Sequence, residues 1–187
     1  MIASAPTSAL PLPGDLSPEE EIRRMVRVNH AGEYGAKRIY EGQLAFLRSN
    51  SPLRAKIEHM AEQEREHLEA FEAELVQRRI RPTALFPLWH VAGFALGAAT
   101  ALMGDKAAMA CTIAVEEVID QHYAEQSERL GQAEAPLKQK IDQFRAEELE
   151  HRDTAVAEGG REAVAFPVLE AAIKTGSRLA IWLAQRV

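Results

Sequence analysis

Residues 63–71, QEREHLEAF, and residues 144–153, FRAEELEHRD, decide the fold of this chain. Each stretch contains one Glu-x-x-His motif: Glu64 with His67, and Glu148 with His151. In both stretches the motif falls within an apolar stripe of helical period, so its carboxylate and imidazole face the core. A carboxylate in such a stripe is costly unless a cation or a hydrogen-bond donor compensates for it. The two motifs therefore predict metal ligands on two core-facing helices.

A further glutamate precedes each motif, one helix earlier. Glu33 precedes the first motif and Glu116 the second at nearly equal spacing. Four helices with inward carboxylates, two of them adding a histidine, form the ligand set of a di-iron or di-manganese site. Glu117 competes with Glu116 as a ligand, but it lies about 100° round the helix from the apolar positions, so we prefer Glu116. The alternative is that these residues form unlinked polar pairs on solvated faces, such as the face expected to carry Glu147. This alternative agrees less well with the repeat.

The helices around these two glutamates are faintly similar to each other. Each has a tyrosine seven residues and a glutamine ten residues beyond its glutamate: Tyr40 with Gln43, and Tyr123 with Gln126. This similarity indicates an internal duplication. We expect two helical hairpins, related by a pseudo-two-fold axis, that face each other across the metals.

Helix caps and breakers divide the rest of the chain. Ser17-Pro18-Glu19-Glu20 combines an N-cap, a first-turn proline and a capping-box glutamate. Residues 1–16 have three prolines, no basic region and no unbroken apolar run, so we expect a flexible tail without a signal or transit peptide. Residues 17–187 are expected to form one domain. Its helices should cover about 18–48, 52–79, 105–131, 135–157 and 167–186.

Composition excludes several classes of protein. The chain has 187 residues, 47% of them hydrophobic, so it is not disordered overall. A net charge of −6 leaves no basic footprint for nucleic acid, and no nucleic-acid motif is present. The lone Cys111 cannot form an internal disulfide and is expected to be a small core residue.

Residues 83–104, TALFPLWHVAGFALGAATALMG, form an apolar segment between the two half-sites. A single membrane span here would put the half-sites on opposite sides of the bilayer, which a shared metal site forbids. We favour an interfacial helix in one leaflet, with Trp89 at headgroup depth. The alternative is a buried helix packed through small residues: Gly93, Gly97 and Ala101. The C-terminal helix either shares the lipid surface or packs within the bundle.

Five strings together resemble the demethoxyubiquinone hydroxylases of ubiquinone biosynthesis, over about residues 20–187: residues 27–43, 63–71, 81–104, 109–123 and 144–153. The resemblance implies an all-α, ferritin-like four-helix bundle with a di-iron core. It also implies an apolar interfacial helix between the two helical hairpins and an amphipathic helix at the C-terminus. The family's metal ligands match the residues found above: Glu33, Glu64, His67, Glu116, Glu148 and His151. His122 and Tyr123 match family positions near the metals, where His122 either transfers a proton or caps a core hydrogen bond. Asn29 stands where some relatives have aspartate.

The activity implied is O₂-dependent hydroxylation of the quinol ring of a polyprenylated demethoxyubiquinol, 2-polyprenyl-3-methyl-6-methoxy-1,4-benzoquinol. Two iron ions per chain would be the cofactor, O₂ the co-substrate, and the reductant is open. Expected partners are the lipid-soluble quinol and a membrane surface, with oligomers or quinone-biosynthesis complexes left open. The expected location is the cytoplasmic face of a bacterial inner membrane, or the mitochondrial inner membrane for a mature eukaryotic form. The rival is a ferritin-like iron-storage or ferroxidase protein, which needs no lipid-facing segment.

Overall fold

The computed structural model describes residues 16–187. The predicted tail over residues 1–16 therefore lies, apart from Leu16, outside the described residues. The described part contains no strand and has six α-helices and two short 3₁₀ helices: α1 (Pro18–Phe46), α2 (Arg54–Arg78), α3 (Phe86–Met103), α4 (Asp105–Arg129), η1 (Gln132–Glu134), α5 (Ala135–Ala157), η2 (Gly160–Glu162) and α6 (Phe166–Ala184). The all-α prediction is confirmed, and the helix bounds lie within a few residues of those expected.

The first helix begins where the sequence predicts. Glu20 donates its main-chain N–H to Ser17 Oγ over 3.2 Å, while Ser17 N donates to Glu20 Oε2 over 3.0 Å. This reciprocal pair satisfies two main-chain donors that a helix N-terminus leaves free, and Pro18 follows in the first turn. The capping box therefore starts α1, the helix that carries Glu33.

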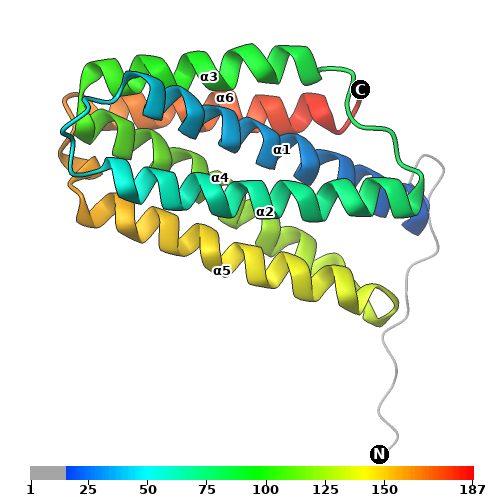
Figure 1. Ribbon diagram of the computed structural model, residues 1–187. Helices are drawn as coiled ribbons and strands as arrows, with labels where there is room; N and C mark the ends of the chain where they lie inside the picture. Colours follow the sequence, from blue (N-terminus) through cyan, green and yellow to red (C-terminus); the bar gives the residue numbers. More distant parts are fainter. Residues whose placement is uncertain (1–15) are drawn as a thin grey trace, which may run out of the picture.

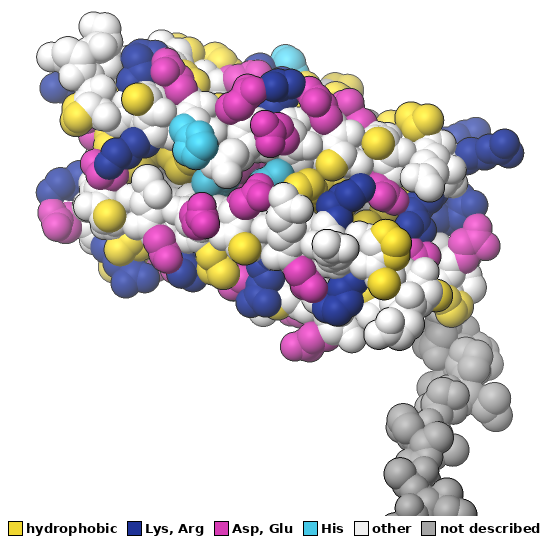
Figure 2. All heavy atoms as spheres, turned by 60° about the horizontal axis from the view of Figure 1, so that its bottom comes forward, with side chains coloured by type: hydrophobic (Ala, Val, Ile, Leu, Met, Phe, Trp, Pro, Cys, Tyr) yellow, Lys and Arg dark blue, Asp and Glu magenta, His cyan; other side chains and the backbone are white. Residues whose placement is uncertain are grey.

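Two antiparallel hairpins form the frame of the molecule (Figure 1). α1 packs against α2, and α4 packs against α5. The two remaining long helices cover one side of this frame, because α3 packs on α1 and α6 packs on α4. The face turned away from α3 and α6 carries intermixed acidic and basic side chains (Figure 2).

The helix α3 has two unlike faces. Its small residues Gly93, Gly97 and Ala101 are buried, and a Cβ on Gly93 would lie 2.8 Å from the carbonyl oxygen of Gly35 in α1. Four of its large apolar residues are exposed: Leu88, Val91, Leu102 and Met103. Small-residue packing and an apolar outer surface, proposed as alternatives, thus occur on the same helix. Among residues 16–187, α3 is the one helix long and apolar enough to cross a membrane, and most of its residues are not buried.

The other outer helix, α6, has the same double character. Ile173 and Ala184 are buried, whereas Val168, Leu179 and Trp182 are exposed. Trp89 of α3, by contrast, is half-buried and packs against Val28 and Ala31 of α1. Of the two tryptophans, Trp182 is therefore the more accessible.

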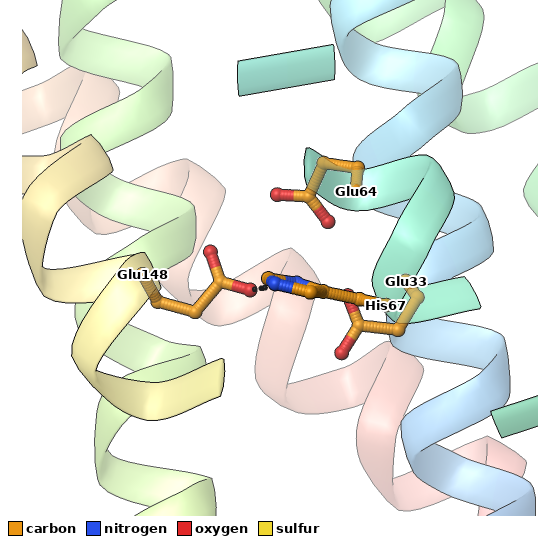
Figure 3. A group of neighbouring side chains, drawn as sticks. All are labelled: Glu33, Glu64, His67 and Glu148. Carbon is orange, nitrogen blue, oxygen red and sulfur yellow. Dashed lines mark hydrogen bonds and ion pairs between the residues drawn. The ribbon is translucent and has the colours of Figure 1, made fainter. Parts of the chain in front are cut away.

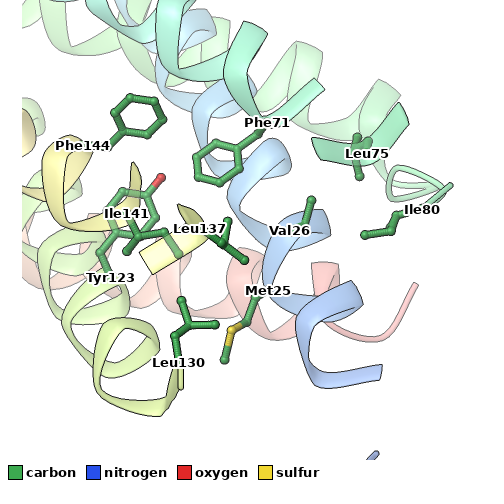
Figure 4. Close-up of a cluster of buried hydrophobic side chains, with 10 residues drawn as sticks. All are labelled: Met25, Val26, Phe71, Leu75, Ile80, Tyr123, Leu130, Leu137, Ile141 and Phe144. Atoms are coloured by element: carbon green, nitrogen blue, oxygen red, sulfur yellow. The ribbon is translucent and has the colours of Figure 1, made fainter. Parts of the chain in front are cut away.

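Apolar clusters surround the polar centre of the bundle. One cluster joins α1, α2, α4 and α5, and Figure 4 shows its side chains: Met25, Val26, Phe71, Leu75, Ile80, Tyr123, Leu130, Leu137, Ile141 and Phe144. A second cluster holds Tyr40, Met60 and Met109. Cys111 is a free thiol in a third cluster, fully buried as expected. These clusters keep water from the carboxylates between them.

A single residue joins α3 to α4. Gly104 lies between Met103 and Asp105, with φ at 115°. This left-handed backbone favours glycine, because a Cβ would clash with the main chain. The apolar helix therefore leads directly into the helix that carries Glu116.

Candidate metal centre

The four helices of the frame bring the six predicted ligands together. α1 contributes Glu33, α2 contributes Glu64 and His67, α4 contributes Glu116, and α5 contributes Glu148 and His151. All six are buried, with at most 2% of each residue exposed. Ionisable residues are almost never buried to this degree unless they are paired.

These residues form two overlapping groups. Glu33 and His67 share one group with Glu64 and Glu148, and the other group contains Glu64, Glu116, Glu148 and His151. In each group the donor atoms lie within 4.8 Å of one another. Figure 3 shows the first group, whose side chains converge from α1, α2 and α5. Glu64 and Glu148 belong to both groups, so each could serve as a ligand in either one.

The two histidines contact Glu148 through equivalent atoms. His67 Nδ1 lies 3.1 Å from Glu148 Oε1, and His151 Nδ1 lies 3.0 Å from Glu148 Oε2. Each imidazole also approaches a second carboxylate: His67 Nδ1 is 3.6 Å from Glu33 Oε2, and His151 Nδ1 is 3.4 Å from Glu64 Oε1. Both Nδ1 atoms therefore point to the centre.

The tyrosines of the internal repeat cross between the half-sites. Tyr40 of α1 donates to Glu116 Oε1 over 2.8 Å, and Tyr123 of α4 donates to Glu33 Oε1. Each of these glutamates is left with one buried oxygen, Oε2, that has no hydrogen-bond partner. The similarity of the two helices predicted that the tyrosines are equivalent, but not that each supports the glutamate of the other helix.

The orphaned oxygens fit metal ions. Oε2 of Glu33, Oε2 of Glu116 and both oxygens of Glu64 are buried without a hydrogen-bond partner. A buried acceptor without a partner normally costs about 1–3 kcal/mol, and more if charged. Two divalent cations would satisfy these oxygens and balance four carboxylates. Carboxylate oxygens with imidazole nitrogens are hard ligands that suit iron or manganese.

The pKa values of the buried carboxylates and imidazoles are shifted by burial and by their mutual contacts. Burial, followed by repulsion from Glu148, raises the pKa of Glu64 and of Glu116 well above the ordinary value. Burial also opposes ionisation of Glu148, but hydrogen bonds from His151 and His67 outweigh it and lower the pKa of Glu148 to about 2. Burial likewise disfavours the charged form of His67, yet its hydrogen bond with Glu148 and the nearby negative charge of Glu33 raise its pKa to about 12. These shifts favour the protonated forms of Glu64, Glu116 and His67 and the ionised form of Glu148.

The outward nitrogen of each histidine has its own partner. His67 Nε2 lies 2.6 Å from Glu147 Oε2, and His151 Nε2 lies 3.0 Å from Gln63 Oε1. Glu147 was expected on a solvated face, and that interpretation is wrong, since only 24% of its side chain is exposed and it binds an imidazole. Glu147 and Gln63 could have been found from sequence, because each directly precedes the glutamate of a Glu-x-x-His motif.

The competing glutamate points elsewhere. Glu117 accepts a hydrogen bond from Lys174 of α6, and it belongs to neither group of candidate ligands. The helical phase that favoured Glu116 over Glu117 therefore agrees with the geometry.

His122 lies outside both ligand groups, in a polar chain beside them. The side-chain amides of Asn29 and Gln126 donate to each other over 2.8 and 2.7 Å. The second Gln126 Nε2 hydrogen donates to His122 Nε2 over 2.7 Å, which places the imidazole proton on Nδ1. Burial lowers the pKa of His122 to about 4, so the ring is neutral near pH 7. Asn29 thus contacts Gln126 and belongs to neither group of candidate ligands.

An apolar cavity of about 460 Å³ reaches the centre from the side covered by α3 and α6. Its lining is almost wholly apolar and includes Trp89, Leu96 and Ile173. Glu33, His122 and Tyr123 also line this cavity, whereas Glu116 does not. An apolar ligand in the cavity would therefore lie beside the half of the centre that contains Glu33.

The chain matches one family model over residues 20–184, that of ubiquinone biosynthesis protein COQ7. It is 60% identical over 176 residues to the 3-demethoxyubiquinol 3-hydroxylase of Rhodospirillum rubrum, and the match covers 94% of this chain and 83% of the relative. It is 48% identical over 170 residues to the human NADPH-dependent 3-demethoxyubiquinone 3-hydroxylase, mitochondrial, covering 89% and 78%. The 5-demethoxyubiquinone hydroxylase, mitochondrial, of Saccharomyces cerevisiae is 42% identical over 180 residues, covering 88% and 77%.

Proposed function

The chain belongs to the family of ubiquinone biosynthesis protein COQ7, and from this premise we propose that it hydroxylates the quinol ring of a polyprenylated demethoxyubiquinol with O₂. The observation that carries the proposal is the junction of a buried carboxylate and histidine centre with an apolar cavity. A storage protein would need the centre but not the cavity, so the ferritin-like alternative is less well supported.

We propose two iron ions per chain, held by the six buried residues: Glu33, Glu64, His67, Glu116, Glu148 and His151. When bound, the two ions supply the activation of O₂ that ring hydroxylation needs. Glu64 and Glu148 could help to hold either ion, since both belong to the two groups. Tyr40 and Tyr123 hold the remaining glutamates in place, each by one oxygen, and leave the other oxygen free.

The cavity would hold the ring and the first part of the prenyl tail. His122 and Tyr123 line it beside Glu33 and are our candidates for residues that contact the ring. A neutral His122 with its proton on Nδ1 can donate a hydrogen bond to a ring oxygen. Tyr123 donates to Glu33, so it is more directly involved in orienting that ligand.

The lipid-soluble substrate suggests a membrane surface as the place of access. The two helices that cover the cavity, α3 and α6, expose seven large apolar side chains: Leu88, Val91, Leu102, Met103, Val168, Leu179 and Trp182. We propose that these side chains enter one leaflet, so that the tail passes from lipid into the cavity. The eukaryotic relatives are named as mitochondrial, and an inner membrane is the corresponding location proposed for this protein.

The reaction is tested with purified, iron-loaded protein, a short-tailed demethoxyquinol and ¹⁸O₂. NADPH and a chemical reductant are supplied in parallel assays, because the human relative is named as NADPH-dependent. Mass spectrometry should find a hydroxylated ring that carries one ¹⁸O atom. An unlabelled new hydroxyl would exclude a monooxygenase. Rapid iron oxidation with mineral deposition and no quinol turnover would favour iron storage instead.

A further inference from the structure

The internal duplication is broken at one chemically important position. Gln63 precedes Glu64 in the first motif, and Glu147 precedes Glu148 in the second. Each of these residues reaches across the bundle to the histidine of the other motif, Glu147 to His67 and Gln63 to His151. The two half-sites thus have the same geometry, but one histidine is supported by a carboxylate and the other by a neutral amide.

The difference changes the strength of the two imidazoles as ligands. Both present Nδ1 to the centre, so Nε2–H is the donor in each outward hydrogen bond. A charged acceptor makes such a bond shorter and stronger than a neutral one, and the distances of 2.6 and 3.0 Å follow that order. A carboxylate partner also makes the imidazole a better electron donor to a metal. Gln143 Nε2 donates to Glu147 Oε1 over 2.9 Å and keeps the carboxylate oriented.

We propose that Glu147 is a positioning residue that makes the two metal positions unequal, with the His67 position binding iron more tightly. The inference rests on the proposed metal centre. The tighter position is also the one that faces the apolar cavity, because Glu33 belongs to the His67 group and lines that cavity. Iron would therefore be retained longest beside the substrate, and the His151 position would be the one that exchanges.

Anaerobic titration of the metal-free full-length protein with Fe²⁺ tests the proposal. Calorimetry should resolve two steps in the wild-type protein. With one equivalent of ⁵⁷Fe²⁺, one Mössbauer quadrupole doublet should dominate. Glu147→Gln should weaken the tighter step about 10-fold and give two doublets of similar area. Gln63→Glu should also equalise the doublets, but by strengthening the weaker step, which loss of folding cannot do.

Glu150→Gln is the matched control, since it removes one charge from an exposed position on the same helix. It should keep the wild-type ratio of doublets. Equal filling of both doublets in the wild-type protein, or an unchanged ratio in both Glu147→Gln and Gln63→Glu, would overturn the inference while leaving the metal centre intact. Failure of the wild-type protein to bind iron would overturn the metal centre and this inference together.

Discussion

Gly97 of α3 lies directly against the carbonyl group of Ile39 in α1, and a methyl group on Gly97 would overlap that oxygen. Because the obstacle is main chain, it cannot move as a side-chain end would. Gly97→Ala should therefore force α3 away from α1 and lower the free energy of unfolding by about 1–3 kcal/mol. Urea unfolding measures this change. Gly176→Ala in α6 is the control, since its Cβ would meet nothing within 4 Å, and it should not destabilise the protein. Equal stability of the two variants would contradict the packing argument.

Glu116→Ala should remove at least one iron ion and abolish turnover while helicity stays near that of the wild type. Tyr40 holds one oxygen of Glu116 and the other has no partner, so the variant would lose the carboxylate oxygen proposed to bind iron. Metal analysis and circular dichroism measure the two effects. Glu117→Ala should retain both ions, because Glu117 binds Lys174 instead. Full iron occupancy in Glu116→Ala would refute the ligand assignment.

Removal of iron from the wild-type protein should lower its thermal midpoint. The metal-free centre leaves buried carboxylate oxygens without partners, whereas a ligand that binds only the folded state stabilises it. Differential scanning calorimetry with and without a chelator gives the shift. The same treatment should change the midpoint of Glu148→Ala much less, since that variant lacks a carboxylate shared by both groups. Identical shifts in the two proteins would argue against metal in this centre.

Glu74→Gln should destabilise the protein near neutral pH and matter little in acid. Glu74 binds Arg78 of its own helix and Lys140 of α5, each over 2.7 Å. Burial opposes ionisation of Glu74, but these two cations outweigh it and lower its pKa. A carboxylate whose pKa is lowered in the folded state stabilises the fold at pH values above its ordinary pKa. This stabilisation is lost as the pH falls through the lowered pKa. Urea unfolding should show a loss of about 1–3 kcal/mol at about pH 7 that shrinks below about pH 4. A pH-independent difference would exclude the ion pairs as its cause.

Phospholipid vesicles should shift the tryptophan fluorescence of the protein to shorter wavelength, mainly through Trp182. Trp182 of α6 is 49% exposed, with the Arg186 guanidinium over its ring, whereas Trp89 is less exposed before lipid is added. The chain has two tryptophans, so Trp182→Phe should remove most of the shift and Trp89→Phe should preserve it. Unchanged fluorescence of the wild-type protein with vesicles would count against a lipid-facing surface.

The sequence predicted best what depends on periodicity and caps. The four ligand-bearing helices and the meeting of Glu33, Glu64 and Glu148 follow from apolar stripes in helical phase, which nearly determine the face of each residue. Contacts that cross between helices were not predictable in the same way. That Tyr40 supports Glu116, or that Glu147 reaches His67, depends on the separation and rotation of packed helices. For residues 83–104, a lipid-facing helix and a buried helix are alternatives on sequence alone. A single helix can bury its small residues and expose several of its large apolar ones.

The one-residue link at Gly104 ties the outer surface of the molecule mechanically to its centre. α3 is held along α1 by close main-chain contact and ends one residue before α4, which carries Glu116. If α3 tilts, either the backbone rotates at Gly104 or the start of α4 moves with α3. Stiffening that link transfers more of any strain to the helix that bears the ligand. The position of α3 at the outer surface and the position of Glu116 at the centre are thus linked through Gly104.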